Sequence, residues 1–215
     1  MHRHRHTASR RRHAGIGPAG RCLLLCLVGL ALAGCGGKGS SPTPPTPPPS
    51  LEERLIRGWT FYRDRDLVPA RTEFALAAAA FDSSGEPHLG LAWTAAQADS
   101  PSVALAECAA ALARGAGEDG WVARAFVLGA AGQDSLALDS LERGYRAPYT
   151  LRWDPRVDDR AIAVLRAIAL YDLARYADCY AVLRTLDPEI SIDLRAIDSR
   201  ERLAAELDRL ERLLP

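Results

Sequence analysis

The sequence predicts an all-α protein: about four helix–turn–helix units stacked after residue 50, followed by a C-terminal capping helix. After residue 50, apolar residues recur at spacings of three and four, the period of an amphipathic helix. Neither the alternating pattern of a half-buried strand nor an Asn-Gly hairpin turn occurs there. The same small and large residues also recur 34 positions apart, which indicates a repeat architecture.

The first 34 residues predict a cleavable secretory signal. Residues 1–21 are basic, residues 22–33 are almost purely apolar, and small residues follow at once. This order of segments is typical of secretory signals. The apolar run is shorter than the ~20 residues that a helix needs to cross a bilayer, so it is not interpreted as a transmembrane anchor.

The signal ends in Leu32-Ala33-Gly34-Cys35, which resembles the lipobox of bacterial lipoproteins. The resemblance implies that the Cys35 thiol takes a diacylglyceryl group and becomes the first residue of the mature chain. Such an anchor holds because each buried methylene contributes ~0.8 kcal/mol. Gly36 rather than Asp follows the cysteine, which by the same resemblance favours the outer membrane of the cell envelope. The alternatives are an ordinary signal with a chance cysteine and a twin-arginine signal at residues 10–12.

Residues 35–50 predict a tether that begins at the lipidated cysteine. Residues 36–50 are Gly, Ser, Thr, Pro and one Lys, with no apolar side chain able to pack. Proline fixes φ and cannot donate a backbone hydrogen bond, so we expect an extended polyproline II segment of ~3.1 Å per residue. It would hold the domain away from the membrane. The alternative is a ligand for a proline-reading domain.

The charge balance argues against nucleic acid as a partner. The chain has 27 basic and 27 acidic residues, but six arginines and no acidic residue precede Cys35. Cleavage therefore leaves 21 basic against 27 acidic residues, a formal net charge of −6. An acidic surface repels phosphate backbones at long range.

A repeat of 34 residues covers the first two helical units. The first unit contains Gly58, Trp59, Phe61, Ala70, Phe74 and Ala77, and the second contains Ala92, Trp93, Ala95, Ala104, Cys108 and Ala111. A third unit has Ala125, Leu128, Ala137 and Leu141, and a fourth, after a loop at about 147–159, has Ala167, Leu170, Cys179 and Leu183. Residues 51–190 thus resemble tetratricopeptide (TPR) repeats, which implies a right-handed superhelical stack of about four helix pairs.

Residues 191–215 predict the capping helix. Leu203, Leu207, Leu210 and Leu214 form one stripe of a helix that begins near Asp198 or Ser199 as its N-cap. A dimerisation coiled coil is the rival interpretation, but it needs more heptads than this segment has.

Residue types that carry chemistry are sparse after the cleavage point. His88 is the one histidine left, and it lies near no nucleophile motif, so we interpret it as a surface loop residue. We expect Cys108 and Cys179 to be packed free thiols, because their repeats lie too far apart for a disulfide. The acidic segment 153–159 lacks the spacing of a calcium loop and is interpreted as a solvated turn in which Asp159 caps the next helix. The sequence therefore predicts no catalytic, cofactor or metal site.

The TPR resemblance implies a concave groove lined by the first helix of each pair. Carried over position by position, it suggests a groove for a protein or peptide partner at Trp59, Tyr62, Arg63, Trp93, Gln97, Phe126, Ile168, Tyr171 and Asp172. Aromatic residues with a nearby arginine are the types that carry binding energy at interfaces. The alternative is that these aromatic side chains pack between adjacent first helices.

These observations predict a lipid-anchored adaptor or scaffold of the bacterial cell envelope, with its domain in the periplasm or on the cell surface. The alternative functions are a helical accessory subunit that binds cell-wall or secreted polymer, and an enzyme whose site has no recognisable motif.

Overall fold

The computed structural model describes residues 47–212. The predicted signal, the predicted lipidation site Cys35, most of the predicted tether and Leu214 lie outside the described residues. Within them the chain forms nine α-helices and no strand. The helices are α1 (Leu51–Arg63), α2 (Leu67–Ala80), α3 (Glu86–Gln97), α4 (Pro101–Ala113), α5 (Gly117–Ala130), α6 (Asp134–Gly144), α7 (Asp159–Asp172), α8 (Tyr176–Leu186) and α9 (Ser199–Glu211). The all-α prediction is confirmed for this part of the chain.

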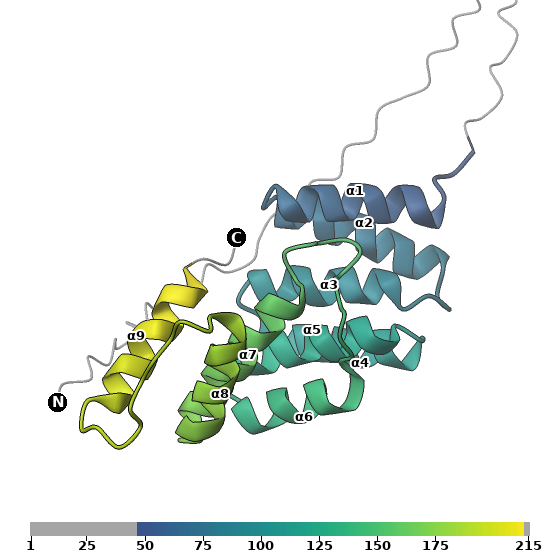
Figure 1. Cartoon of the computed structure of the whole chain (residues 1–215). Coiled ribbons are helices and arrows are strands. Elements are labelled where there is room, and N and C mark those ends of the chain that lie inside the picture. Colours follow the sequence, from purple (N-terminus) through teal and green to yellow (C-terminus); the bar gives the residue numbers. More distant parts are fainter. Residues whose placement is uncertain (1–46, 213–215) are drawn as a thin grey trace, which may run out of the picture. The chain divides into compact units, whose positions relative to one another are not determined.

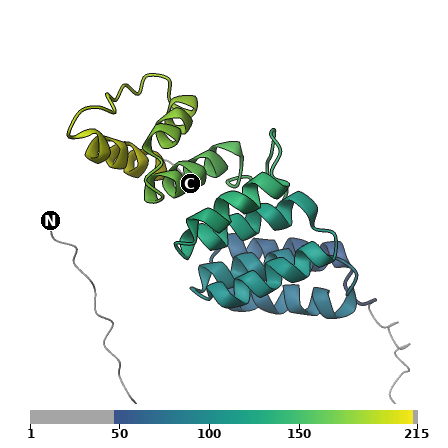
Figure 2. The same cartoon turned by 90° about the horizontal axis from the view of Figure 1, so that it is seen from below.

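Consecutive helices pack against each other from α1 to α8, and α9 packs against both α7 and α8. The first helices of successive pairs, α1, α3, α5 and α7, also contact one another in a row (Figure 1). The second helices α2 and α4 do not touch, so a space opens between them above α3. A second view shows the helices of successive pairs lying side by side (Figure 2).

The four turns within the helix pairs share one backbone design. In each turn the chain passes through a residue with positive φ: Arg65, Asp99, Gly132 and Ala174. The next residue donates its N–H to a carbonyl five residues back, in Asp66 to Phe61, Ser100 to Ala95, Gln133 to Leu128 and Arg175 to Leu170, at 2.8–3.0 Å. This is the 6→1 bond of a Schellman motif, which satisfies orphan carbonyls at a helix end. The same geometry also ends α4, where Gly115 has positive φ and the Ala116 N–H donates to the Ala111 carbonyl at 3.0 Å.

The packing between the first pairs depends on Phe74 of α2. Its ring is fully buried and lies between Gly58 of α1 and Gly90 of α3. A Cβ atom at either glycine would come within 2.5 Å of the ring. Three helices can therefore meet at this ring only because both neighbours lack a side chain.

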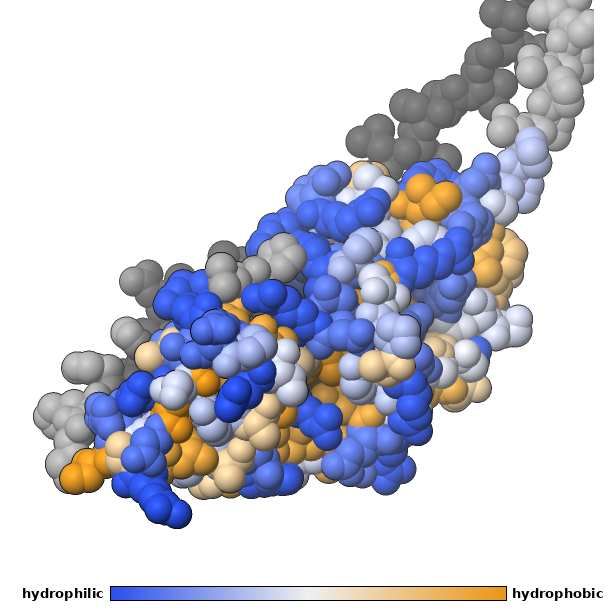
Figure 3. All heavy atoms as spheres, viewed as in Figure 1, coloured by the Kyte–Doolittle hydropathy of each residue, from blue (hydrophilic) through white to orange (hydrophobic). Residues whose placement is uncertain are grey.

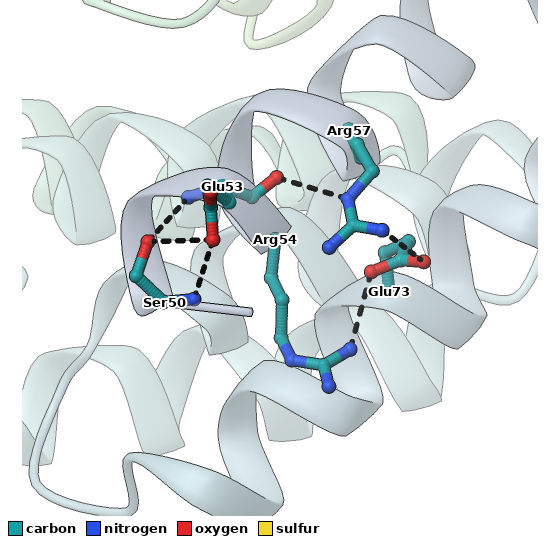
Figure 4. A network of polar contacts seen from close by, with 5 residues as sticks. All are labelled: Ser50, Glu53, Arg54, Arg57 and Glu73. Atoms are coloured by element: carbon teal, nitrogen blue, oxygen red, sulfur yellow. Dashed lines mark hydrogen bonds and ion pairs between the residues drawn. The ribbon is translucent and has the colours of Figure 1, made fainter. Parts of the chain in front are cut away.

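The start of α1 is fixed by a capping box and by ion pairs to α2 (Figure 4). The Ser50 hydroxyl accepts from the Glu53 N–H at 3.2 Å, and the Glu53 carboxylate accepts from the Ser50 N–H at 2.7 Å. The Ser50 N–H and, at 3.1 Å, the Ser50 hydroxyl both donate to this carboxylate and hold the pKa of Glu53 below its usual value. Arg54 and Arg57 both reach Glu73 of α2, at 3.3 and 3.9 Å. Helix α1 thus has a defined start, with Ser50 as its N-cap.

The last helix buries the predicted leucines Leu203, Leu207 and Leu210 against α7 and α8. Asp198 is its N-cap residue, but its side chain makes no capping hydrogen bond.

Candidate functional site

The aromatic residues predicted to line a groove lie mostly inside the protein. Trp59 is 1% exposed, Tyr62 is 3% and Trp93 is 9%. The Trp59 ring packs edge-on against Tyr62 and Phe74, at centroid distances of 5.2 and 5.3 Å. Of the two alternatives that the sequence left open, the burial of these three side chains favours packing between the helices.

The other predicted groove residues do not form one surface. Arg63 and Gln97 are exposed at the ends of α1 and α3, and Phe126 of α5 is half-buried against Trp93 at 5.5 Å. Tyr171 packs with Tyr176 at 5.5 Å, and its hydroxyl donates to the Arg200 carbonyl. Asp172 and Ile168 lie near Tyr171 on α7, Ile168 within a second apolar cluster around α7, α8 and α9.

The first helices α1, α3 and α5 present one face, which we name the first-helix face. It is covered by residues 145–158, the connection between α6 and α7, which we name the cover loop. The loop passes in front of α3 and reaches α1 (Figure 1). The Trp153 ring stacks on Trp59 with a centroid distance of 6.3 Å and an angle of 4°. Leu151 and Val157 are buried in the same apolar cluster as Trp59. The exposed surface there is mostly hydrophilic, with apolar side chains in small separate groups (Figure 3).

Arg152 adds a polar link between the cover loop and two helices. Its guanidinium lies 2.6 Å from the Glu52 carboxylate of α1 and 3.8 Å from that of Glu86 of α3. It also lies over the Trp153 ring at 4.3 Å. These groups are well exposed, so the ion pairs contribute little free energy. They orient the loop on the two helices.

The cover loop has a folded structure of its own. Thr150 and Asp158 form an isolated antiparallel bridge, and the Leu151 N–H donates to the Val157 carbonyl at 2.9 Å. At the tip, Asp154 is 4% exposed and accepts two hydrogen bonds of 2.7 Å from Arg156. The expectation of a solvated turn is therefore wrong, because this carboxylate is buried and paired.

The base of the loop is fixed by tyrosines. The hydroxyl of Tyr149 donates to Asp119 of α5, and that of Tyr145 donates to Asp159, both at 2.8 Å. Asp158, not Asp159 as predicted, caps α7 by accepting from the Ala161 N–H at 2.9 Å. Asp159 is occupied by the loop instead.

Because Tyr62 and Tyr149 are buried, we expect the protein to lose stability at alkaline pH. Burial, together with the charge of Asp154, raises the pKa of Tyr62 to about 12, and burial and Asp119 raise the pKa of Tyr149 above its usual value. Above pH ~10 the unfolded chain releases phenolic protons that the folded chain keeps, so the free energy of unfolding falls by up to ~1.4 kcal/mol per pH unit for each tyrosine. We expect Tyr62→Phe and Tyr149→Phe to flatten this fall in urea unfolding between roughly pH 8 and 11. Equal slopes in the variants and the wild type would contradict the assignment.

A second surface, which the sequence did not predict, is an open cleft between α2 and α4 with α3 as its floor. Its volume is about 660 Å³. Val68, Leu76 and Val103 line it and are partly or largely exposed. The hydroxyls of Thr72 and Thr94 also line it, but both donate to carbonyls of their own helices. The sequence signal for this cleft was the set of aliphatic residues that lie outside the buried stripes of α2 and α4.

The remaining candidate residues are placed as follows. His88 lies in α3 rather than in a loop, half-buried, with Nδ1 2.8 Å from the Glu107 carboxylate of α4. Cys108 and Cys179 are buried free thiols, as predicted, and burial raises their pKa values to about 12 and about 11. Among residues 47–212, no cluster of three or more His, Cys, Asp or Glu side chains is arranged to hold a metal ion. None of the described helices is long and apolar enough to span a membrane.

Comparisons of the chain with protein families, with characterised proteins and with solved structures give no match.

Proposed function

We propose that this protein is a lipoprotein adaptor of the bacterial cell envelope, anchored through Cys35, whose helix pairs form a TPR-like right-handed superhelix that binds other proteins. The observation that supports it most is the repeated turn described above. The turns within the four helix pairs share one positive-φ position and one 6→1 hydrogen bond, as copies of one unit would. Stacked units of this kind create extended binding surfaces.

The two surfaces of the first four helices give the adaptor places to bind. The first-helix face holds a folded peptide segment, the cover loop, through stacked rings, buried aliphatic side chains and an arginine. The cleft between α2 and α4 presents exposed aliphatic side chains. Apolar surface of this kind on a folded domain is typical of interaction sites.

The anchor is tested by substituting cysteines of the signal region. The protein is expressed in a bacterial envelope with an alkyne fatty acid, and labelling and detergent phase partitioning are measured. We expect Cys35→Ser to lose the label and leave the detergent phase, whereas Cys26→Ser, its matched control, keeps both. A labelled Cys35→Ser protein would refute this anchor.

The adaptor role is tested by site-specific photo-crosslinking in intact cells. A photoreactive residue replaces Gln97 at the edge of the first-helix face, Val103 in the cleft, or Ala205 on the exposed side of α9 as a control. We expect a discrete crosslinked protein from Gln97 or Val103 that Ala205 does not give. The same products from all three positions, or none from any, would count against an adaptor.

A further inference from the structure

We propose that the first-helix face is a peptide-binding site that the cover loop occupies in cis. Its partner in trans is a short turn of another protein with an aliphatic, a basic and an aromatic residue in the order of Leu151-Arg152-Trp153. This inference rests on the proposed adaptor function and names the partner of one of its surfaces.

The site consists of side chains from helices distant in sequence from the loop. Trp59 of α1 offers a flat ring for stacking, and Glu52 of α1 with Glu86 of α3 offers two carboxylates for one guanidinium. The loop supplies Trp153 to the ring and Arg152 to the carboxylates. One short segment thus provides both the ring and the guanidinium, as a peptide ligand would.

The loop divides into a base and a tip that are held by different partners. The base is held by hydrogen bonds from Tyr149 to α5 and from Tyr145 to the start of α7. The ring and ion-pair contacts to α1 and α3 come from Arg152 and Trp153. A tip that leaves the face withdraws the buried Leu151 and Val157 together with these two side chains, while the base contacts of Tyr145 and Tyr149 remain.

Two buried tryptophans of the first helices, Trp59 at the site and Trp93 on α3, carry hydrogen-bond donors without a partner within residues 47–212. The indole Nε1 atoms of Trp59 and Trp93 are buried, and no acceptor among the described residues reaches them. An unsatisfied buried donor costs about 1–3 kcal/mol. A partner turn that places a carbonyl or carboxylate oxygen beside either indole gains a hydrogen bond that the loop does not make. This difference gives the partner an advantage over the loop.

The covalent attachment of the cover loop sets how tightly a partner must bind to displace it. A segment joined by short flexible connections acts at an effective concentration on the order of millimolar. A partner that makes only the contacts of the loop therefore cannot displace it at micromolar concentration. The wild-type site is selective for segments that bind better than its own loop.

The test uses the full-length protein purified in detergent. The probe is a fluorescent backbone-cyclised peptide of residues 149–158, whose ring replaces the bridge between Thr150 and Asp158. Leu151→Ser/Trp153→Ser removes the tip's anchors, and Ile197→Ser, a fully exposed apolar residue before α9, is the matched control. In fluorescence anisotropy we expect the double variant to bind the probe at least tenfold more tightly than the wild type and Ile197→Ser do. A probe with serine at the two anchor positions should not bind.

A double variant that has native circular dichroism and binds no probe would overturn the inference, and so would equal binding by the double variant and the wild type. If the double variant does not fold, amide hydrogen exchange in the wild-type protein tests the inference instead. At millimolar probe, we expect faster amide exchange for residues 149–157 and unchanged exchange in α2. Unchanged exchange in the loop would overturn the inference. Cellular crosslinks from Val103 without probe binding would leave the adaptor function intact and remove only this site.

Discussion

Trp59→Ala is expected to lower the free energy of unfolding by about 3–5 kcal/mol, the usual cost of truncating a buried large aromatic residue. The side chain is 1% exposed and contacts rings from α1, α2 and the cover loop. Its loss would open a cavity and also remove the surface on which Trp153 stacks. Urea unfolding followed by far-ultraviolet circular dichroism measures the change.

Ile56→Ala on the same helix is the matched control, because Ile56 is 50% exposed. Its effect should stay within about 0.5 kcal/mol. A Trp59→Ala cost as small as that of the control would mean that the Trp59 side chain is not part of the core. The interpretation of Trp59 as an open groove residue would then be restored.

The helices and their pairing could be predicted because their signals are local. Apolar spacing identifies each buried stripe, and the 34-residue spacing aligns small residues with the close helix contacts. The positive-φ residues of the turns were less visible. Arg65, Asp99 and Ala174 are not glycines, and their conformation is set by the Schellman bonds of the surrounding helix ends.

The cover loop could not be predicted as a contact, because its partners lie on α1, α3 and α5. One signal was present: Tyr149, Leu151 and Trp153 occupy alternate positions, as in a strand with one buried side. Over residues 149–153 the burial alternates in the same way, and the alternation ends where Asp154 is buried and Pro155 is exposed. The interpretation of residues 153–159 as a solvated turn rested on their aspartates and did not use this alternation.

The burial of the predicted groove residues depends on contacts that position-by-position transfer from TPR repeats could not supply. The transfer suggested that Trp59 and Trp93 line a groove, whereas Phe74 and Trp153 pack on Trp59 and Phe126 packs on Trp93. It also carried no information about the two separate apolar clusters, one with Trp59 and the other with Tyr171.

Phe74→Ala is expected to cost a similar 3–5 kcal/mol. The ring is fully buried, and the neighbours Gly58 and Gly90 have no side chains that could relax into the space it leaves. The cavity therefore stays largely unfilled, which places the cost toward the upper end of the range. Chemical unfolding of the purified protein again gives the value.

Gly90→Ala tests whether contact with the Phe74 ring causes that cost. Its effect on the free energy of unfolding should change sign between the wild type and the Phe74→Ala variant. In an exposed helix this substitution would gain about 1 kcal/mol from helix propensity. In the wild type the new Cβ would lie 2.5 Å from the Phe74 ring, so we expect Gly90→Ala to destabilise by about 1–3 kcal/mol. In the Phe74→Ala background the same methyl group enters the cavity and should stabilise the protein. Equal effects of Gly90→Ala in both backgrounds would show that the ring and the glycine are not in contact, since residues that share no contact contribute additively.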